Sequence, residues 1–123
     1  MNKNNNSIKK AKLLITIVDR NKTEFYTDVL SEFECNMQMV LYGNGTADNK
    51  TLKTLGLNNE KGIILSVIRT DKIKSALNTL DEKFKTIKNG KGIAVVVPIS
   101  SVMGVSLYQF MINNRQNRGE LNV

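Results

Sequence analysis

The segment at residues 89–101 reads Asn-Gly-Lys-Gly-Ile-Ala-Val-Val-Val-Pro-Ile-Ser-Ser and joins a glycine-containing loop to an apolar β-strand. Gly90 and Gly92 allow backbone conformations and close approaches that a Cβ atom would prevent. Residues 93–97 are an uninterrupted run of β-prone side chains, closed by Pro98, the only proline of the chain. Because successive side chains of a strand point to opposite faces, this strand presents apolar groups to both sides of its sheet. Both faces of the sheet must therefore be covered.

The length and composition of the chain indicate one globular domain. It has 123 residues, of which 41% are hydrophobic and 24% are charged. No apolar run approaches the roughly 20 residues that cross a bilayer, and the asparagine-rich start lacks the apolar segment of a secretory signal. The single cysteine, Cys35, has no partner for an internal disulfide. We therefore expect a cytoplasmic protein.

The chain is basic, with a net charge of +7, and such a surplus can favour nucleic acid, anionic lipid or phosphorylated ligands. The lysines, however, are scattered among acidic residues, as is typical of solvated helix faces. No arrangement of arginine and aromatic residues indicates base stacking. We therefore expect no nucleic-acid partner.

The residue types needed for catalysis are scarce. The chain has no histidine, which removes the commonest general base and a frequent metal ligand. Cys35 accordingly has no histidine partner, and Ser100 and Ser101 lie in no nucleophile motif. We therefore predict a protein that is not an enzyme and that has no metal site.

Apolar periodicity predicts the element order βαββαβ. Strands are expected at residues 12–18, 37–42, 63–68 and 93–97, and the main helices at 23–34 and 70–87. A short helix is expected at 48–55, with Thr46 or Asp48 as its N-cap. The apolar face of the first helix is predicted to consist of Phe25, Val29, Leu30 and Phe33.

Two right-handed strand-helix-strand units give an α+β, ferredoxin-like fold with a four-stranded antiparallel sheet and both main helices on one face. The other face would expose a large apolar surface, so we expect oligomerisation through it. The folded domain is expected at residues 12–105. A flexible N-terminal tail is expected at 1–11, and a partly helical or frayed C-terminal extension at 106–123.

Two glycine-containing segments are the candidates for ligand binding. The first precedes the predicted short helix, whose free amides can hold an anion, and the second adds backbone donors and a lysine. Hydroxyl groups near both segments can donate further hydrogen bonds. Tight-turn geometry is the alternative explanation for the glycines. The candidate ligand-binding residues are Gly43, Asn44, Gly45, Thr46, Gly90, Lys91, Gly92 and Ser100.

The order βαββαβ, the corner Tyr42-Gly43-Asn44-Gly45 and the segment Gly90-Lys91-Gly92-Ile93-Ala94-Val95-Val96-Val97-Pro98 resemble the nitrogen regulatory PII signalling family. The likeness covers residues 12–102. It implies a ferredoxin-like homotrimer that binds adenine nucleotides in clefts between subunits, with ATP, ADP and AMP as candidate ligands. It also implies a long loop after the second strand that docks onto target proteins such as membrane transporters.

Several positions differ from the family pattern. The phosphate-binding lysine of the family falls on Ile93, and Lys91 lies nearby. The two arginines expected after the last strand fall on Gly104 and Ser106, and the arginine of the glycine corner falls on Thr46. The short helix at residues 48–55 takes the place of the long docking loop.

The sequence therefore predicts a divergent PII-like signal transduction protein that senses a small anionic metabolite between subunits. Its regulated partner would be a transporter or an enzyme. Two other interpretations stay open: a basic trimeric module that binds nucleic acid or anionic lipid, and a structural trimer that has lost ligand binding.

Overall fold

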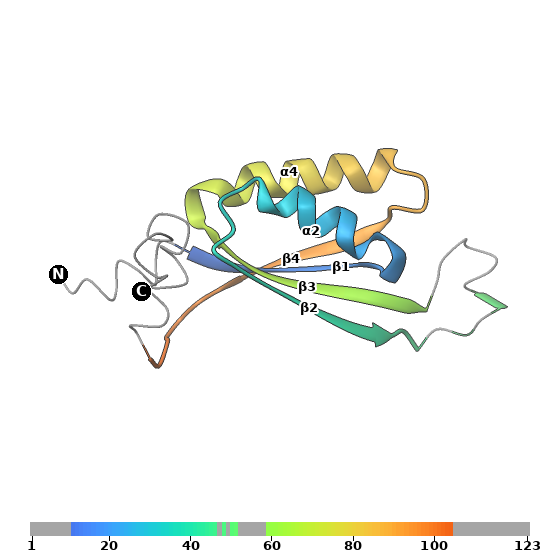
Figure 1. Ribbon diagram of the computed structural model, residues 1–123, viewed down its shortest axis with the longest axis horizontal. Helices are drawn as coiled ribbons and strands as arrows, with labels where there is room; N and C mark the ends of the chain where they lie inside the picture. Colours follow the sequence, from blue (N-terminus) through green and yellow to red (C-terminus); the bar gives the residue numbers. More distant parts are fainter. Residues whose placement is uncertain (1–10, 47, 49, 52–58, 105–123) are drawn as a thin grey trace, which may run out of the picture.

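The computed structural model describes residues 11–46, 48, 50–51 and 59–104, which form one antiparallel sheet with two helices on one side (Figure 1). The strands are β1 (Ala11–Asp19), β2 (Met37–Asn44), β3 (Glu60–Arg69) and β4 (Gly92–Pro98), in the spatial order β2-β3-β1-β4. The helical elements are the 3-10 turn η1 (Arg20–Lys22) and helices α2 (Thr23–Ser31) and α4 (Thr70–Thr86). The predicted α+β, ferredoxin-like fold is confirmed.

The element boundaries differ from the predicted ones by a few residues. β1 already begins at Ala11, whose side chain is buried. α2 ends at Ser31, before the predicted end at residue 34, and Glu34 adopts a left-handed backbone conformation with a φ of 55°. The predicted N-terminal tail, C-terminal extension and most of the short helix lie outside the described residues. In the described ranges, no helix has the length and apolar character needed to cross a membrane.

The core lies between the helices and one face of the sheet. Buried residues of both helices pack on β1 and β3, and Phe33, Val40, Ala94 and Val96 extend this cluster. The predicted face of α2 was wrong at one position, since Phe25 is 37% exposed and its neighbour Tyr26 is fully buried. The buried members of the core are Leu14, Val18, Tyr26, Leu30, Cys35, Ile64, Ile68, Ile73, Ala76 and Leu80.

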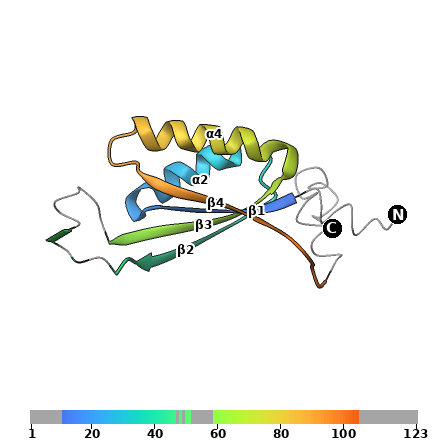
Figure 2. The same cartoon turned by 180° about the vertical axis from the view of Figure 1, so that it is seen from behind.

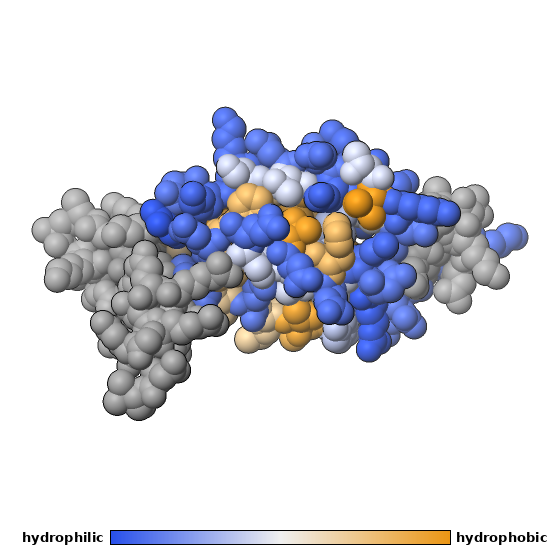
Figure 3. Space-filling view, turned by 45° about the horizontal axis from the view of Figure 1, so that its top comes forward, coloured by the Kyte–Doolittle hydropathy of each residue, from blue (hydrophilic) through white to orange (hydrophobic). Residues whose placement is uncertain are grey.

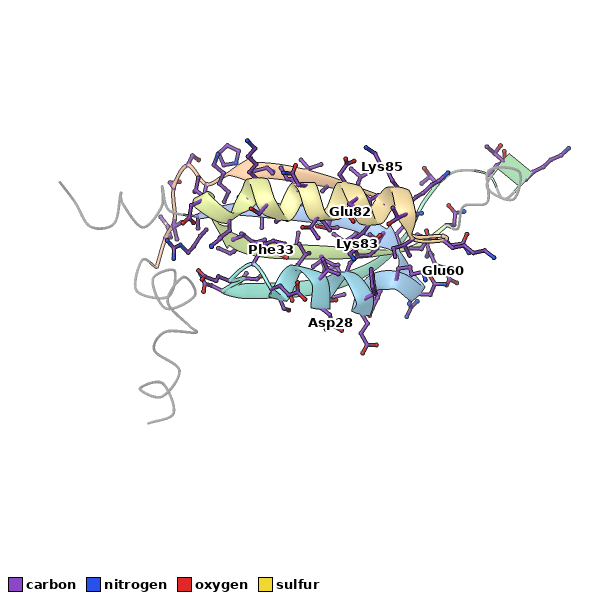
Figure 4. All side chains as sticks on the ribbon, turned by 90° about the horizontal axis from the view of Figure 1, so that it is seen from above. Asp28, Phe33, Glu60, Glu82, Lys83 and Lys85 are labelled. Atoms are coloured by element: carbon purple, nitrogen blue, oxygen red, sulfur yellow. The ribbon has the colours of Figure 1, made fainter. Side chains whose placement is uncertain are left out.

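The outward surface of the helices is largely hydrophilic, and apolar side chains are visible mainly in its middle (Figure 3). From above, Phe33 and Lys83 lie between the two helices (Figure 4). Lys85 lies beyond α4 and Asp28 beyond α2 in the same view. The helix side of the molecule is therefore a solvated surface.

The strand register assigns the sheet residues to two faces. Leu14 lies opposite Ser66 of β3 and Val96 of β4, and the pairing continues along the strands without interruption. Because side chains alternate along a strand, the even-numbered residues face the helices and the odd-numbered ones face away. We call the second surface the open face, because neither helix covers it (Figure 1).

The middle of the open face is apolar. Its side chains form three rows that each cross all four strands, and most of them are only partly buried. Among them, Met39 is 49% exposed and Ile93 is 60% exposed. The rows are Met37-Val67-Leu13-Val97, Met39-Leu65-Ile15-Val95 and Leu41-Ile63-Ile17-Ile93.

The helix-covered face is the more polar of the two. Gln38, Thr16 and Ser66 all lie on it, beside apolar residues of the core. Thr16 and Ser66 are fully buried, and their hydroxyl groups have no hydrogen-bond partner among the described residues. In the rows that cross all four strands, the face that the helices leave uncovered is therefore the more apolar one.

Two glycines let the helices approach the covered face. A Cβ atom on Gly62 would collide with the Thr23 side chain at the start of α2. A Cβ atom on Gly92 would lie 2.7 Å from the Ile17 carbonyl oxygen and 2.8 Å from the Phe84 ring. Both glycines are therefore explained by packing within one copy of the chain.

Gly43 is different, because it lies on the open face. A Cβ atom there would meet only the Ile63 side chain, at an ordinary contact distance of 3.8 Å. Packing within the described part of the chain does not require a glycine at this position.

We predict that Gly92→Ala destabilises the fold and that Gly43→Ala does not. The added methyl group at residue 92 must displace backbone and ring atoms, which costs about 1 to 3 kcal/mol. At residue 43 the free energy of unfolding should change by less than about 0.5 kcal/mol. Urea denaturation of both variants measures the difference, and similar losses in the two would contradict the packing explanation.

We also predict that Thr16→Val stabilises the protein. Valine keeps the shape of threonine and removes a buried hydroxyl group that lacks a partner, so the free energy of unfolding should rise by about 1 kcal/mol. Thr86→Val is the matched control, because Thr86 is exposed and donates to the Glu82 carbonyl at 2.9 Å. Thermal or urea unfolding tests this, and a destabilised Thr16→Val protein would show that the hydroxyl group is bonded.

Candidate functional site

The two candidate glycine segments lie at the same end of the sheet but at opposite edges. The end of β2 and the start of β4 are both found there (Figure 2). The last row that crosses all four strands at this end consists of Tyr42, Gly62, Val18 and Gly92, and β2 and β4 are the edge strands. The row spans three strand spacings, or roughly 14 Å. One copy of the chain therefore keeps the two segments apart.

The second glycine segment is a tight turn between α4 and β4. Asn89 has a φ of 58°, and the Gly90 N–H donates to the Ile87 carbonyl at 3.0 Å. Gly90 is buried, and a Cβ atom on it would lie 2.7 Å from Ile87 Cβ. Lys91, which follows, is exposed. Turn geometry thus explains Gly90, while the Lys91 side chain is accessible to a ligand.

Tyr26 of α2 forms a hydrogen bond to this turn. Its hydroxyl group donates to the Gly90 carbonyl, which lies 64 residues further along the chain. Burial raises the pKa of Tyr26 above its ordinary value, so the hydroxyl group stays a protonated donor at neutral pH. Tyr26 was not among the residues predicted from the sequence. Its spacing of four from Leu30 and seven from Phe33 was the available signal.

The first glycine segment closes the connection between β2 and β3. The Gly45 N–H donates to the Asn59 carbonyl at 2.6 Å, and a Cβ atom on Gly45 would lie 2.7 Å from Asn59 Oδ1. Asn44 pairs with Glu60 in the sheet. Asn44, Gly45 and Thr46 are exposed. The Asn59 side-chain oxygen can move away from such a Cβ atom, so packing does not require a glycine at residue 45, and the polar residues beside it are open to solvent.

Asp48 is one of the two N-cap candidates that the sequence offered, and it has the hydrogen bonds of a cap. Its carboxylate accepts from the Lys50 N–H at 2.7 Å, the Thr51 N–H at 3.2 Å and the Thr51 hydroxyl group at 2.6 Å. These bonds, the Thr51 hydroxyl first, lower the pKa of Asp48. Both carboxylate oxygens of Asp48 accept capping hydrogen bonds, so Asp48 and not Thr46 is the cap.

Charged residues that sequence reasoning missed lie between the two segments. The Arg20 guanidinium lies 4.5 Å from the centre of the Tyr42 ring. Beside it, Lys61 Nζ and Asp19 Oδ1 form an ion pair at 2.7 Å. Lys61 thus neutralises Asp19, and no described carboxylate forms an ion pair with Arg20.

Ser100 lies at the other end of the sheet. It follows Pro98, which pairs with Lys12, whereas Gly92 pairs with Val18. The adjacent residues Ile99 and Val102 pack against the buried pair Ala11 and Val67. Ser100 itself is exposed. It can join the glycine segments only if it comes from another copy of the chain.

The position of the family's phosphate-binding lysine is also informative. Ile93 belongs to an apolar row of the open face and is exposed there. Gly104 is exposed, and residue 106 lies outside the described residues. Among the residues that the structure describes, no group of three His, Cys, Asp or Glu side chains is placed to hold a metal ion. Lys91 and Arg20 are therefore the cations best placed to meet an anionic ligand.

Comparison with known proteins finds no matching protein-family model and no matching curated protein. Solved structures do match. CPII from Thiomonas intermedia K12, bound to ADP, AMP and acetate, has a TM-score of 0.56 and 16% identity, covering 71% of this chain and 83% of CPII.

A second structure of CPII, described as a nitrogen regulatory PII-like protein and bound to ADP, AMP and bicarbonate, has a TM-score of 0.53 and 17% identity over 70% of this chain and 86% of that one. A functionally unknown protein from Pediococcus pentosaceus ATCC 25745 has a TM-score of 0.55 and 13% identity, and the match covers 77% of this chain and 97% of that protein. At such identities the likeness concerns the fold alone. The chain has the fold of the PII-like protein CPII, which confirms at that level the resemblance expected from its sequence.

Proposed function

We propose that this protein is a PII-like regulator that binds a small anionic metabolite between the subunits of a homotrimer. The observation that carries the proposal is the fold shared with a PII-like protein whose structures contain ADP and AMP. ADP, AMP and ATP are therefore the first candidate ligands. The role is regulatory rather than catalytic, and the regulated partner would be a transporter or an enzyme.

The open face supports assembly. Its three rows carry only apolar side chains, and a monomer in water would leave this surface exposed. Burying it against other copies removes the apolar area from water, which is the dominant favourable contribution to association. A closed trimer, as in the PII family that the sequence resembles, would cover the face in every subunit.

Assembly would also complete the binding site. Within one copy, the two glycine segments lie at opposite edges of the sheet and Ser100 lies at the far end. These residues would meet in one cleft only between two neighbouring copies of the chain. The accessible polar groups of that cleft would be Asn44, Thr46 and Lys91 from the glycine segments and Ser100 from a neighbour.

We predict that a lysine on the open face prevents assembly. Val95 is 45% exposed in one copy, so Val95→Lys should leave the monomer folded but would bury an unpaired charge in the trimer. Light scattering during size-exclusion chromatography should give a trimer for the wild type and a monomer for the variant. Ser75→Lys, on the exposed side of α4, is the matched control and should stay trimeric. A monomeric wild type or a trimeric Val95→Lys protein would contradict the interface.

We predict that adenine nucleotides raise the unfolding temperature. A ligand that binds only the native state adds roughly 2.7 kcal/mol at 100 times its dissociation constant. ADP, AMP and ATP should be tested with magnesium by thermal unfolding. Lys91→Ala should reduce the shift, whereas Lys74→Ala, also exposed but in the first half of α4, should not. No shift of the wild type with any of the three would reject adenine nucleotides as the ligand.

A further inference from the structure

Tyr26 connects helix α2 to the second glycine segment through a buried hydrogen bond. The side chain is fully buried, and its hydroxyl group donates to the Gly90 carbonyl. A Cβ atom on Gly90 would lie 3.0 Å from the hydroxyl oxygen, so the backbone of the turn rests directly on it. The hydrogen bond therefore fixes where the Gly90 carbonyl points, which is into the core.

The tyrosine ring is itself held in place. It packs edge-to-face against Phe25, with ring centres 5.1 Å apart, and in a tilted arrangement against Phe84, at 5.3 Å. Phe84 also lies against Gly92. Both glycines of the segment thus rest on one group of aromatic side chains, with Gly90 on Tyr26 and Gly92 on Phe84. The turn is positioned by rigid groups of the core.

The direction of the Gly90 carbonyl determines the direction of the next N–H group. The chain contains no cis peptide bond among the described residues, so the Gly90 carbonyl and the Lys91 N–H point in opposite directions from one peptide unit. With the carbonyl turned inward to Tyr26, the Lys91 N–H is turned outward. The same residue has an exposed ammonium side chain. Lys91 therefore offers a backbone donor and a charge on the same side of the turn.

We propose that Tyr26 is a positioning residue for the anion site of this protein. Its hydrogen bond holds the Gly90–Lys91 peptide with the N–H outward, where a phosphate or carboxylate oxygen of the ligand accepts it. The inference rests on the proposed function, because it places the anionic group of the ligand at the second glycine segment. Tyr26 does not touch the ligand and acts through the orientation of the peptide.

The test is the Tyr26→Phe variant of the full chain, which keeps the ring packing and removes the hydroxyl group. The first measurement, made without ligand, is hydrogen exchange of the Gly90 amide, which donates to the Ile87 carbonyl in the wild type. It should exchange at least about tenfold faster, because the turn loses the bond that holds it. The second is calorimetric titration with ADP, whose affinity should fall about fivefold to tenfold.

Ile73→Val is the matched control, because it loses a buried methyl group in the first turns of α4, far along the helix from the turn. It should lower global stability while leaving both the Gly90 exchange rate and the ADP affinity unchanged. Equal exchange at Gly90 in the wild type and Tyr26→Phe would overturn the positioning role. If the wild type binds ADP, an equal ADP affinity of Tyr26→Phe would also overturn it. If the wild type binds neither ADP nor AMP, the proposed function fails, and the ligand part of this inference fails with it.

Discussion

The structure depends on one constraint, which is that its strands are apolar on both faces. A single layer of two helices can bury only one of those faces, and here it buries the more polar one, which includes Thr16, Ser66 and Gln38. The other face carries only apolar side chains in the three rows that cross all four strands. Hydrophobic burial is the largest favourable term in folding and association, so this distribution links the two processes in one sheet. One face of the sheet packs against the helices within the monomer, and the open face is available for contacts with other copies.

Strand alternation and helix periodicity were enough to predict the four strands, the two helices and their arrangement, because each pattern is repeated over many residues. They were not enough to orient α2. Phe25 and Tyr26 are adjacent aromatic residues, and each lies at helical spacing from other apolar residues. Which of them is buried depends on how the helix is rotated on the sheet, and the contacts with Phe84 and Gly90 decide that rotation. Those contacts join residues far apart in the chain.

The candidate site was predictable only in part for the same reason. The sequence identifies Gly43, Gly45, Gly90 and Gly92 as special positions, but it does not distinguish a glycine required by packing from one required by a ligand. The structure makes this distinction through neighbours such as Phe84 at Gly92 and Ile87 at Gly90. It also places Arg20 over Tyr42, a pairing across 22 positions that no local pattern indicates. Long-range contacts carry the information that the sequence pattern lacks.

The strand order also determines when the sheet can form during synthesis on the ribosome. β1 is made first, yet both of its neighbours, β3 and β4, come later in the chain, and β2 pairs only with β3. The first two strands therefore have no partner strand until β3 (Glu60–Arg69) emerges from the exit tunnel. The register of β1 with β4 is complete only when Pro98 has emerged to meet Lys12. A nascent chain shorter than this holds an apolar strand without its last partner, so the four-stranded sheet closes only after β4 has emerged.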